Sequence, residues 1–173
     1  IQTTDGRTVL IDCGKTFYSA ALETLVPRGV AKIDAVILTH GHADAILGLD
    51  DLRHYSRHHP VEVLLDRDSF KVVSATFPYL VNKDAATGSG VIADLTFKVF
   101  GDDVRVLDVA GIKFEPLRVE HGIHPDGSPF FALGFRIDDS LVYLSDVSAV
   151  PEPVMQLLCE RPIDTLVLDC LHP

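Results

Sequence analysis

Short apolar runs alternate with turn residues along this chain, and they mark where strands are expected. Each run is rich in β-branched residues and too short for a typical helix, which favours strands. An Asp5-Gly6 turn predicts a hairpin over residues 1–13, and three consecutive strands within residues 95–119 are expected to form a meander. Strands are expected at residues 8–11, 33–38, 61–65, 95–100, 104–109, 112–119, 130–137, 141–144 and 164–168.

Apolar residues recur at helical spacing between several of these strands. Asp66 or Asp68 is expected to cap one of the helices, and Pro151 suits the first turn of another. Residues 81–90 are small, polar and glycine-containing, so they are expected to form a loop. The spacing predicts amphipathic helices over residues 15–26, 43–57, 66–80 and 151–159.

Length and composition indicate one domain. The chain has 173 residues, of which 47% are hydrophobic, which is enough for a substantial core. It has no apolar run of membrane-spanning length and no signal-peptide pattern. The sequence begins at Ile1 in what reads as mid-strand and stops at Pro173 just after a strand. We therefore interpret it as an excerpt of a longer protein.

Charge and cysteine usage narrow the function classes. The formal net charge is −10, whereas a protein that binds RNA or DNA normally carries a basic face. The charge therefore favours a small-molecule substrate over a nucleic acid. Cys13, Cys159 and Cys170 are isolated in apolar contexts, which predicts reduced thiols in the core of a cytoplasmic protein.

The residues that follow the strand at 33–38 carry the clearest chemical pattern. His40 and His42 are two positions apart, so in an extended segment both imidazoles face the same side. Asp44 follows at the start of the next expected helix, where a carboxylate caps free N–H groups. Two neutral nitrogen donors and a carboxylate suit Zn²⁺ or a similar first-row metal. The alternative is a polar loop that contains histidines by chance.

This segment resembles the metal motif H-x-H-x-D-H of the metallo-β-lactamase superfamily. It is most similar to the branch of the PhnP-type phosphodiesterases, which is related to ribonuclease Z. The resemblance covers essentially the whole chain and implies an α+β fold, a four-layer αβ/βα sandwich formed by a single, incomplete domain over residues 1–173. The chain departs from the motif at Ala45, where a methyl group stands in place of a second-site histidine and cannot bind a metal.

The resemblance also implies a set of metal ligands at the ends of several strands. His40 and His42 match the paired histidines of the first metal site, and Asp44 matches the aspartate of the second. His121 matches the third histidine, and Asp146 matches the aspartate that bridges both metals. The resemblance therefore predicts five ligands from this chain.

Three further residues have alternative interpretations. Asp12 matches the aspartate of a D-x-G motif that supports the metal site without binding the metal itself. The alternative is that Asp12 is a simple turn residue. His124 competes with His121 for the third position, or faces the substrate as a proton donor, or is a loop residue without a task. The last family histidine is expected beyond Pro173, unless His172 takes its place.

The resemblance implies a metal-dependent hydrolase. Zn²⁺ in one or two sites, with Mn²⁺ or Fe²⁺ as alternatives, would leave a position for water and lower the pKa of that water to about 7. Asp44 would accept the proton as the water attacks phosphorus. We expect a phosphodiesterase for a small phosphate ester. The alternatives are hydrolysis of another ester or thioester, and a metal-binding domain without catalysis. Monomer and homodimer both remain open.

Overall fold

The structure is a computed structural model that describes residues 1–88 and 90–169. The predicted positions of Cys170 and His172 lie outside the described residues. The chain divides into two compact units, Ile1–Asp102 and Asp103–Pro173, and each is described by itself. Among the residues described, none of the helices combines the length and apolarity needed to cross a membrane.

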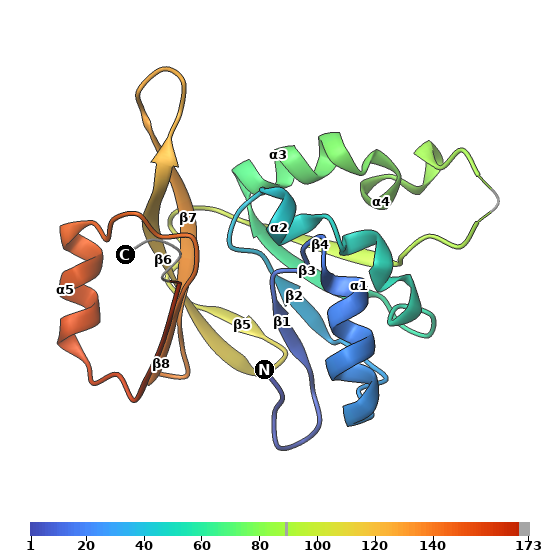
Figure 1. Cartoon of the computed structure of the whole chain (residues 1–173), viewed down its shortest axis with the longest axis horizontal. Helices are drawn as coiled ribbons and strands as arrows, with labels where there is room; N and C mark the ends of the chain where they lie inside the picture. Colours follow the sequence, from blue (N-terminus) through green and yellow to red (C-terminus); the bar gives the residue numbers. More distant parts are fainter. Residues whose placement is uncertain (89, 170–173) are drawn as a thin grey trace. The chain divides into compact units, whose positions relative to one another are not determined.

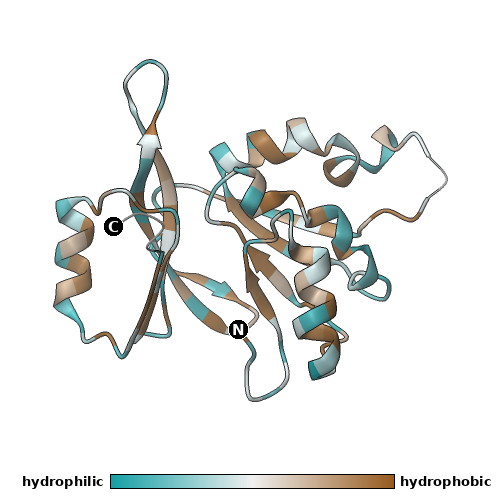
Figure 2. Ribbon diagram, in the orientation of Figure 1, coloured by the Kyte–Doolittle hydropathy of each residue, from teal (hydrophilic) through white to brown (hydrophobic). Residues whose placement is uncertain are grey.

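The first unit contains a four-stranded parallel sheet with the strand order β1-β2-β3-β4 (Figure 1). All three residues of β2 are buried, as expected for a parallel strand that is covered on both faces. Figure 2 shows the strands of this unit as predominantly hydrophobic. The four strands are β1 Val9–Ile11, β2 Ala35–Ile37, β3 Val61–Asp66 and β4 Leu95–Phe100.

The helices of the first unit form where the apolar spacing predicts them, but they are shorter and less regular. Asp66 caps α3 as predicted, accepting a hydrogen bond from the Ser69 N–H at 2.8 Å. The predicted helix over residues 66–80 is interrupted at Phe77, because the residue before Pro78 is disfavoured in the helical conformation. The helical segments are α1 Phe17–Ala20, η1 Ala21–Leu25, η2 Val26–Arg28, α2 Ala43–Ile46, η3 Leu49–His54, α3 Arg67–Thr76, α4 Pro78–Val81 and η4 Lys83–Ala85.

One hydrophobic core joins these helices to the sheet. Side chains from β2, β3, α2, α3 and α4 belong to the same cluster of buried residues. Cys13 lies in this core, and burial raises the pKa of its thiol well above the ordinary range. The predicted core position of Cys13 is therefore confirmed. Cys159, in the second unit, is exposed, so the prediction that its thiol lies in the core is wrong.

The predicted meander over residues 95–119 is wrong. The strand at 95–100 is β4, which pairs in parallel with β3 in the sheet of the first unit. Of the three strands of the predicted meander, β5 and β6 in the second unit do pair, as an antiparallel hairpin. The apolar pattern locates each strand but does not specify its partner, because parallel pairing depends on contacts that are distant in sequence. The two arms of the predicted hairpin do pair across the Asp5-Gly6 turn, through an antiparallel bridge between Gln2 and Thr8. Backbone hydrogen bonds also join Ile1 with Val9, and the Thr3 N–H donates to the Arg7 carbonyl oxygen.

The second unit contains a mixed five-stranded sheet with the order β5-β6-β7-β8-β9. Neighbouring strands are antiparallel except for β9, which is parallel to β8. Helix α5 packs on this sheet through Val154 and Leu158, which join the buried cluster around Leu117 and Val119 (Figure 1). The elements are β5 Leu107–Val109, β6 Ile112–Ile123, β7 Pro129–Ile137, β8 Leu141–Leu144, α5 Glu152–Glu160 and β9 Thr165–Leu168.

A buried arginine holds the end of α5 onto this sheet. Arg136, on β7, is only 1% exposed. Its guanidinium donates hydrogen bonds to the carbonyl oxygens of Asp139 at 2.6 Å and Pro162 at 3.1 Å. It also donates to the carbonyl oxygens of Leu158 at 3.2 Å and Arg161 at 3.4 Å. The last carbonyls of a helix have no partner within the helix, so Arg136 satisfies groups that α5 cannot satisfy itself.

Replacing Arg136 with Met should lower the free energy of unfolding by about 3 kcal/mol, because the carbonyl oxygens around its guanidinium lose their donor. Chemical denaturation would measure the change. Arg105→Met is the matched control, since Arg105 lies in the same unit with an exposed side chain, and it should change stability little. Equal losses in the two variants would contradict a structural role for Arg136.

Candidate metal centre

The candidate centre in the first unit begins where two parallel strands end side by side. β1 and β2 pair in parallel, so Asp12 after β1 and Thr39 after β2 lie at the same edge of the sheet. Asp12 has a left-handed backbone, with φ of 63°, and its two carboxylate oxygens each accept one hydrogen bond from Thr39. The backbone N–H and the hydroxyl of Thr39 are the donors, both at 2.8 Å. The Asp12 carboxylate therefore fixes the start of the histidine loop.

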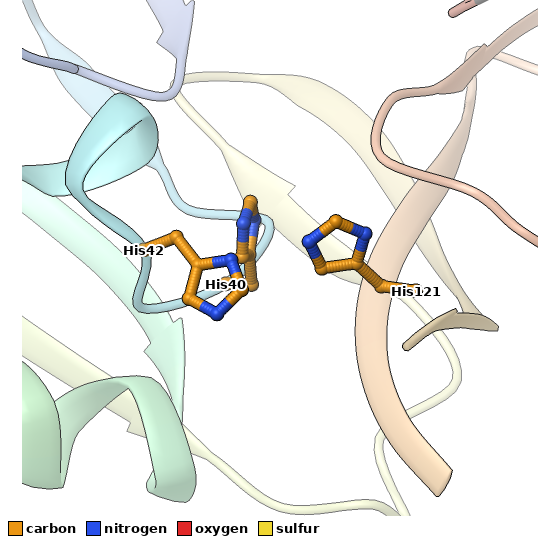
Figure 3. A group of neighbouring side chains, drawn as sticks. All are labelled: His40, His42 and His121. Carbon is orange, nitrogen blue, oxygen red and sulfur yellow. The ribbon is translucent and has the colours of Figure 1, made fainter. Parts of the chain in front are cut away.

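The two predicted histidines lie together on this loop. The rings of His40 and His42 are edge to face, with 4.6 Å between their centroids (Figure 3). His40 is buried, at 2% exposure, whereas His42 is exposed. Nδ1 of His40 lies 2.8 Å from the Thr39 hydroxyl. The prediction that His40 and His42 face the same region is therefore confirmed.

Asp44 lies in the first turn of α2, as predicted. Its Oδ1 atom is 4.0 Å from Nε2 of His40, and its side chain is 60% exposed. The separation is too long for a direct hydrogen bond. The two imidazoles and the carboxylate thus present nitrogen and oxygen donors toward one region, which is the donor set that suits Zn²⁺.

Close backbone packing positions α2 behind these donors. The Cys13 N–H donates to the Ala45 carbonyl oxygen at 2.8 Å, and the Gly48 N–H donates to the Cys13 carbonyl oxygen at 2.8 Å. A Cβ atom at Gly14 would lie 1.5 Å from the Asp44 carbonyl oxygen, so only glycine fits there. The turn after β1 therefore contacts the backbone at both ends of α2.

Ala45 occupies the position at which the superfamily motif has the second-site histidine. Its side chain is 1% exposed and belongs to the hydrophobic core of the first unit. The methyl group offers no donor atom, and its surroundings are apolar. The side chains of the first unit thus reproduce the paired histidines and Asp44 but not the second-site histidine.

The remaining predicted residues lie in the second unit. His121 was expected at the end of a strand but lies within β6, at a bulge between Glu120 and Gly122. The rings of His121 and His124 lie 5.6 Å and 5.2 Å from that of Phe130. The longer strand has a physical cause, since Gly122 continues the pairing with β7 after the bulge.

Asp146 follows β8, as predicted, with a left-handed backbone conformation at φ of 51°. Non-glycine residues in this conformation are uncommon and concentrate at functional sites. His124 is exposed in the β6–β7 loop, where its backbone N–H donates to the Ser128 carbonyl oxygen at 2.8 Å. His121, His124 and Asp146 are the candidate site residues that the second unit supplies.

Sequence reasoning missed Thr39, whose hydroxyl contacts both Asp12 and His40. The only signal for it is its position, directly before the first histidine and at the end of an apolar strand. A hydroxyl at such a position is unremarkable until the pairing of β1 with β2 is known.

A family model described as the beta-lactamase superfamily domain matches residues 7–172. The chain belongs to the metallo-β-lactamase superfamily. A solved structure described as a new diphosphatase from the PhnP family is 31% identical, with a TM-score of 0.73. That match covers 95% of this chain and 56% of the other. The predicted superfamily, its PhnP-like branch and the fold class are thereby confirmed.

Two curated relatives of this superfamily chain also match. The octanoyltransferase of Porphyromonas gingivalis (strain ATCC BAA-308 / W83) is 29% identical over 164 residues, which cover 91% of this chain and 29% of that protein. The anti-Pycsar protein Apyc1 of Paenibacillus sp. (strain J14) is 32% identical over 165 residues, which cover 89% of this chain and 61% of that protein. The chain therefore spans less than two thirds of the length of either relative.

Proposed function

We propose that the protein is a metal-dependent phosphoric diester hydrolase that acts on a small phosphate ester. The observation that carries the proposal is the edge-to-face pair of His40 and His42, with the Asp44 carboxylate 4.0 Å from Nε2 of His40. This donor arrangement occurs in a chain that is 31% identical to a PhnP-family diphosphatase.

The proposed metal ligands are His40, His42 and His121, which match the three histidines of the first metal site in the superfamily motif. Three neutral imidazoles suit Zn²⁺, with Mn²⁺ or Fe²⁺ as alternatives. When bound, such an ion would polarise a phosphoryl oxygen and would make a water molecule acidic near neutral pH. Asp146 is the proposed bridging ligand if a second ion binds, and its left-handed backbone supports a functional role.

The remaining proposed roles concern protons. Asp44 accepts the proton of the attacking water at a carboxylate oxygen, and its 60% exposure lets that proton pass to solvent. His124 donates a proton to the leaving oxygen, as a histidine can in general acid catalysis. Its exposed position in the β6–β7 loop leaves the ring accessible to a substrate.

The charge of the chain supports a small substrate over a polymer. At a net charge of −10, long polyanions are repelled, whereas one phosphate group can still be bound by a cation at the site. Hydrolysis of an acyl ester or thioester is the second candidate. It is favoured by the 29% identity to a protein named as an octanoyltransferase.

The test is hydrolysis of bis(p-nitrophenyl) phosphate by the full-length protein loaded with zinc. We expect turnover that stops on chelation with EDTA and returns on addition of Zn²⁺, with Mn²⁺ and Fe²⁺ compared in parallel. A p-nitrophenyl octanoate assay and an octanoyl thioester assay under the same conditions test the second candidate.

The outcomes separate the functions. Phosphodiester turnover that depends on metal supports the proposal. Turnover of the octanoyl substrates alone would replace it with the acyl hydrolase. Stoichiometric metal binding with no turnover of any substrate would indicate a metal-binding domain without catalysis.

A further inference from the structure

We infer that Thr39 is a positioning residue that sets the tautomer of His40, so that Nε2 carries the lone pair. This inference rests on the proposed metal site, because it concerns one of the proposed ligands. All of the atoms involved belong to the first unit. They form a chain of contacts from the Asp12 carboxylate, through the Thr39 hydroxyl, to the His40 ring.

The direction of the hydrogen bonds follows from the number of protons. A threonine hydroxyl has one proton to donate, and the Thr39 Oγ1 atom has two partners at 2.8 Å. One partner is Oδ2 of Asp12, and an ionised carboxylate only accepts. The hydroxyl proton therefore goes to Asp12, so the other partner, Nδ1 of His40, must donate. A neutral ring with its proton on Nδ1 has its lone pair on Nε2.

Burial makes this direction costly to reverse. Thr39 is 0% exposed and His40 is 2% exposed, so water cannot readily replace a lost partner. The second carboxylate oxygen of Asp12 accepts the Thr39 backbone N–H, which fixes the carboxylate in place. Because Asp12 takes the proton of the Thr39 hydroxyl, that hydroxyl can only accept a hydrogen bond from Nδ1 of His40.

The consequence is a ring prepared for metal binding. Nε2 of His40 lies 4.0 Å from the Asp44 carboxylate, on the side of the ring away from Thr39. Histidine binds a metal through the nitrogen that carries the lone pair, while the other nitrogen donates to a supporting group. Here the supporting group is the Thr39 hydroxyl, and the Asp12 carboxylate orients that hydroxyl by accepting its proton.

Asp12→Asn is the sharpest test, because it should invert the tautomer without removing an atom. The amide oxygen can still accept the Thr39 N–H, but the amide nitrogen must donate to the Thr39 hydroxyl oxygen. That hydroxyl would then donate to Nδ1, and the ring proton would move to Nε2. Asparagine tolerates the left-handed backbone that Asp12 adopts, at φ of 63°, so the variant should fold.

Thr39→Val and Thr39→Ser are the matched pair. Valine has nearly the shape of threonine without the hydroxyl, so the preference of His40 for one tautomer should be lost. Serine keeps the hydroxyl, so the native tautomer should be retained. This pair also decides the inference if the Asp12 variant does not fold.

The measurement is ¹⁵N NMR of the histidine rings in the metal-free protein at about pH 8, above the ordinary histidine pKa. We expect a protonated Nδ1 in the native protein and in Thr39→Ser, and a protonated Nε2 in Asp12→Asn. Zinc titration should show affinity about 10- to 100-fold lower in Asp12→Asn and Thr39→Val than in Thr39→Ser.

An Nδ1 proton retained in folded Asp12→Asn would overturn the inference. So would Thr39→Val with the tautomer and zinc affinity of Thr39→Ser. Because the NMR readout needs neither metal nor substrate, it is independent of the proposed function. If the tautomers shift as expected but the zinc-loaded protein hydrolyses no phosphodiester, the inference stands and the proposed function fails.

Discussion

Replacing His42 with Ala should lower phosphodiester hydrolysis by more than about 100-fold and reduce zinc binding in parallel. Supporting groups of metal ligands already contribute 10- to 100-fold in affinity, so loss of a ligand itself should cost more. His42 is the best proposed ligand to remove because its side chain is exposed, so truncation leaves no core cavity. Truncation of the buried His40 would combine loss of the ligand with loss of packing.

His58→Ala is the matched control, since His58 is also an exposed histidine of the first unit. It should keep native activity and native zinc content, measured by elemental analysis. Thermal unfolding of both metal-free variants should match that of the native protein. Native zinc content and rate in His42→Ala would show that the proposed ligand set is wrong.

Much of the candidate centre could be predicted from the sequence because its pattern is local. His40 and His42 are two residues apart after an apolar strand, and the alternation of side chains in extended backbone places them together. Asp44 follows at the start of a helix, as its capping preference predicts. These predictions needed no knowledge of which strands pair.

The parts that the sequence did not reveal depend on pairing between distant segments. Thr39 and Asp12 are 27 positions apart, and their contacts exist because β1 lies beside β2 in parallel. The same limitation explains why β4 was assigned to a meander when it pairs with β3. Hydrophobic periodicity gives the type of an element, whereas its neighbour depends on the global topology.

At Ala45 the sequence showed only that the second-site histidine is missing. The motif comparison identified a missing ligand, but the structure adds that the methyl group occupies the core of the first unit. A larger side chain at that position would have to displace packed neighbours. The departure from the motif therefore belongs to a packed region and not to an open ligand position.

Replacing Gly14 with Ala should have the largest effect on the stability of the first unit. The added Cβ would lie 1.5 Å from the Asp44 carbonyl oxygen and 2.4 Å from its carbonyl carbon. Because these are backbone atoms, no rotamer change can relieve the overlap. The turn after β1 and the start of α2 must then separate, which strains the 2.8 Å hydrogen bond from the Cys13 N–H to the Ala45 carbonyl oxygen.

We expect Gly14→Ala to lower the free energy of unfolding by about 4 kcal/mol or more. Zinc affinity should fall as well, because the overlap displaces the backbone that carries Asp44. Gly90→Ala is the control, since a Cβ at Gly90 meets no atom within 4 Å, and it should leave both quantities unchanged. Denaturant unfolding and zinc titration of the two variants measure the difference. If Gly14→Ala and Gly90→Ala had the same free energy of unfolding and the same zinc affinity, the close contact between Gly14 and the Asp44 backbone would not stabilise the first unit. The contact would also not be needed to position Asp44 at the metal centre.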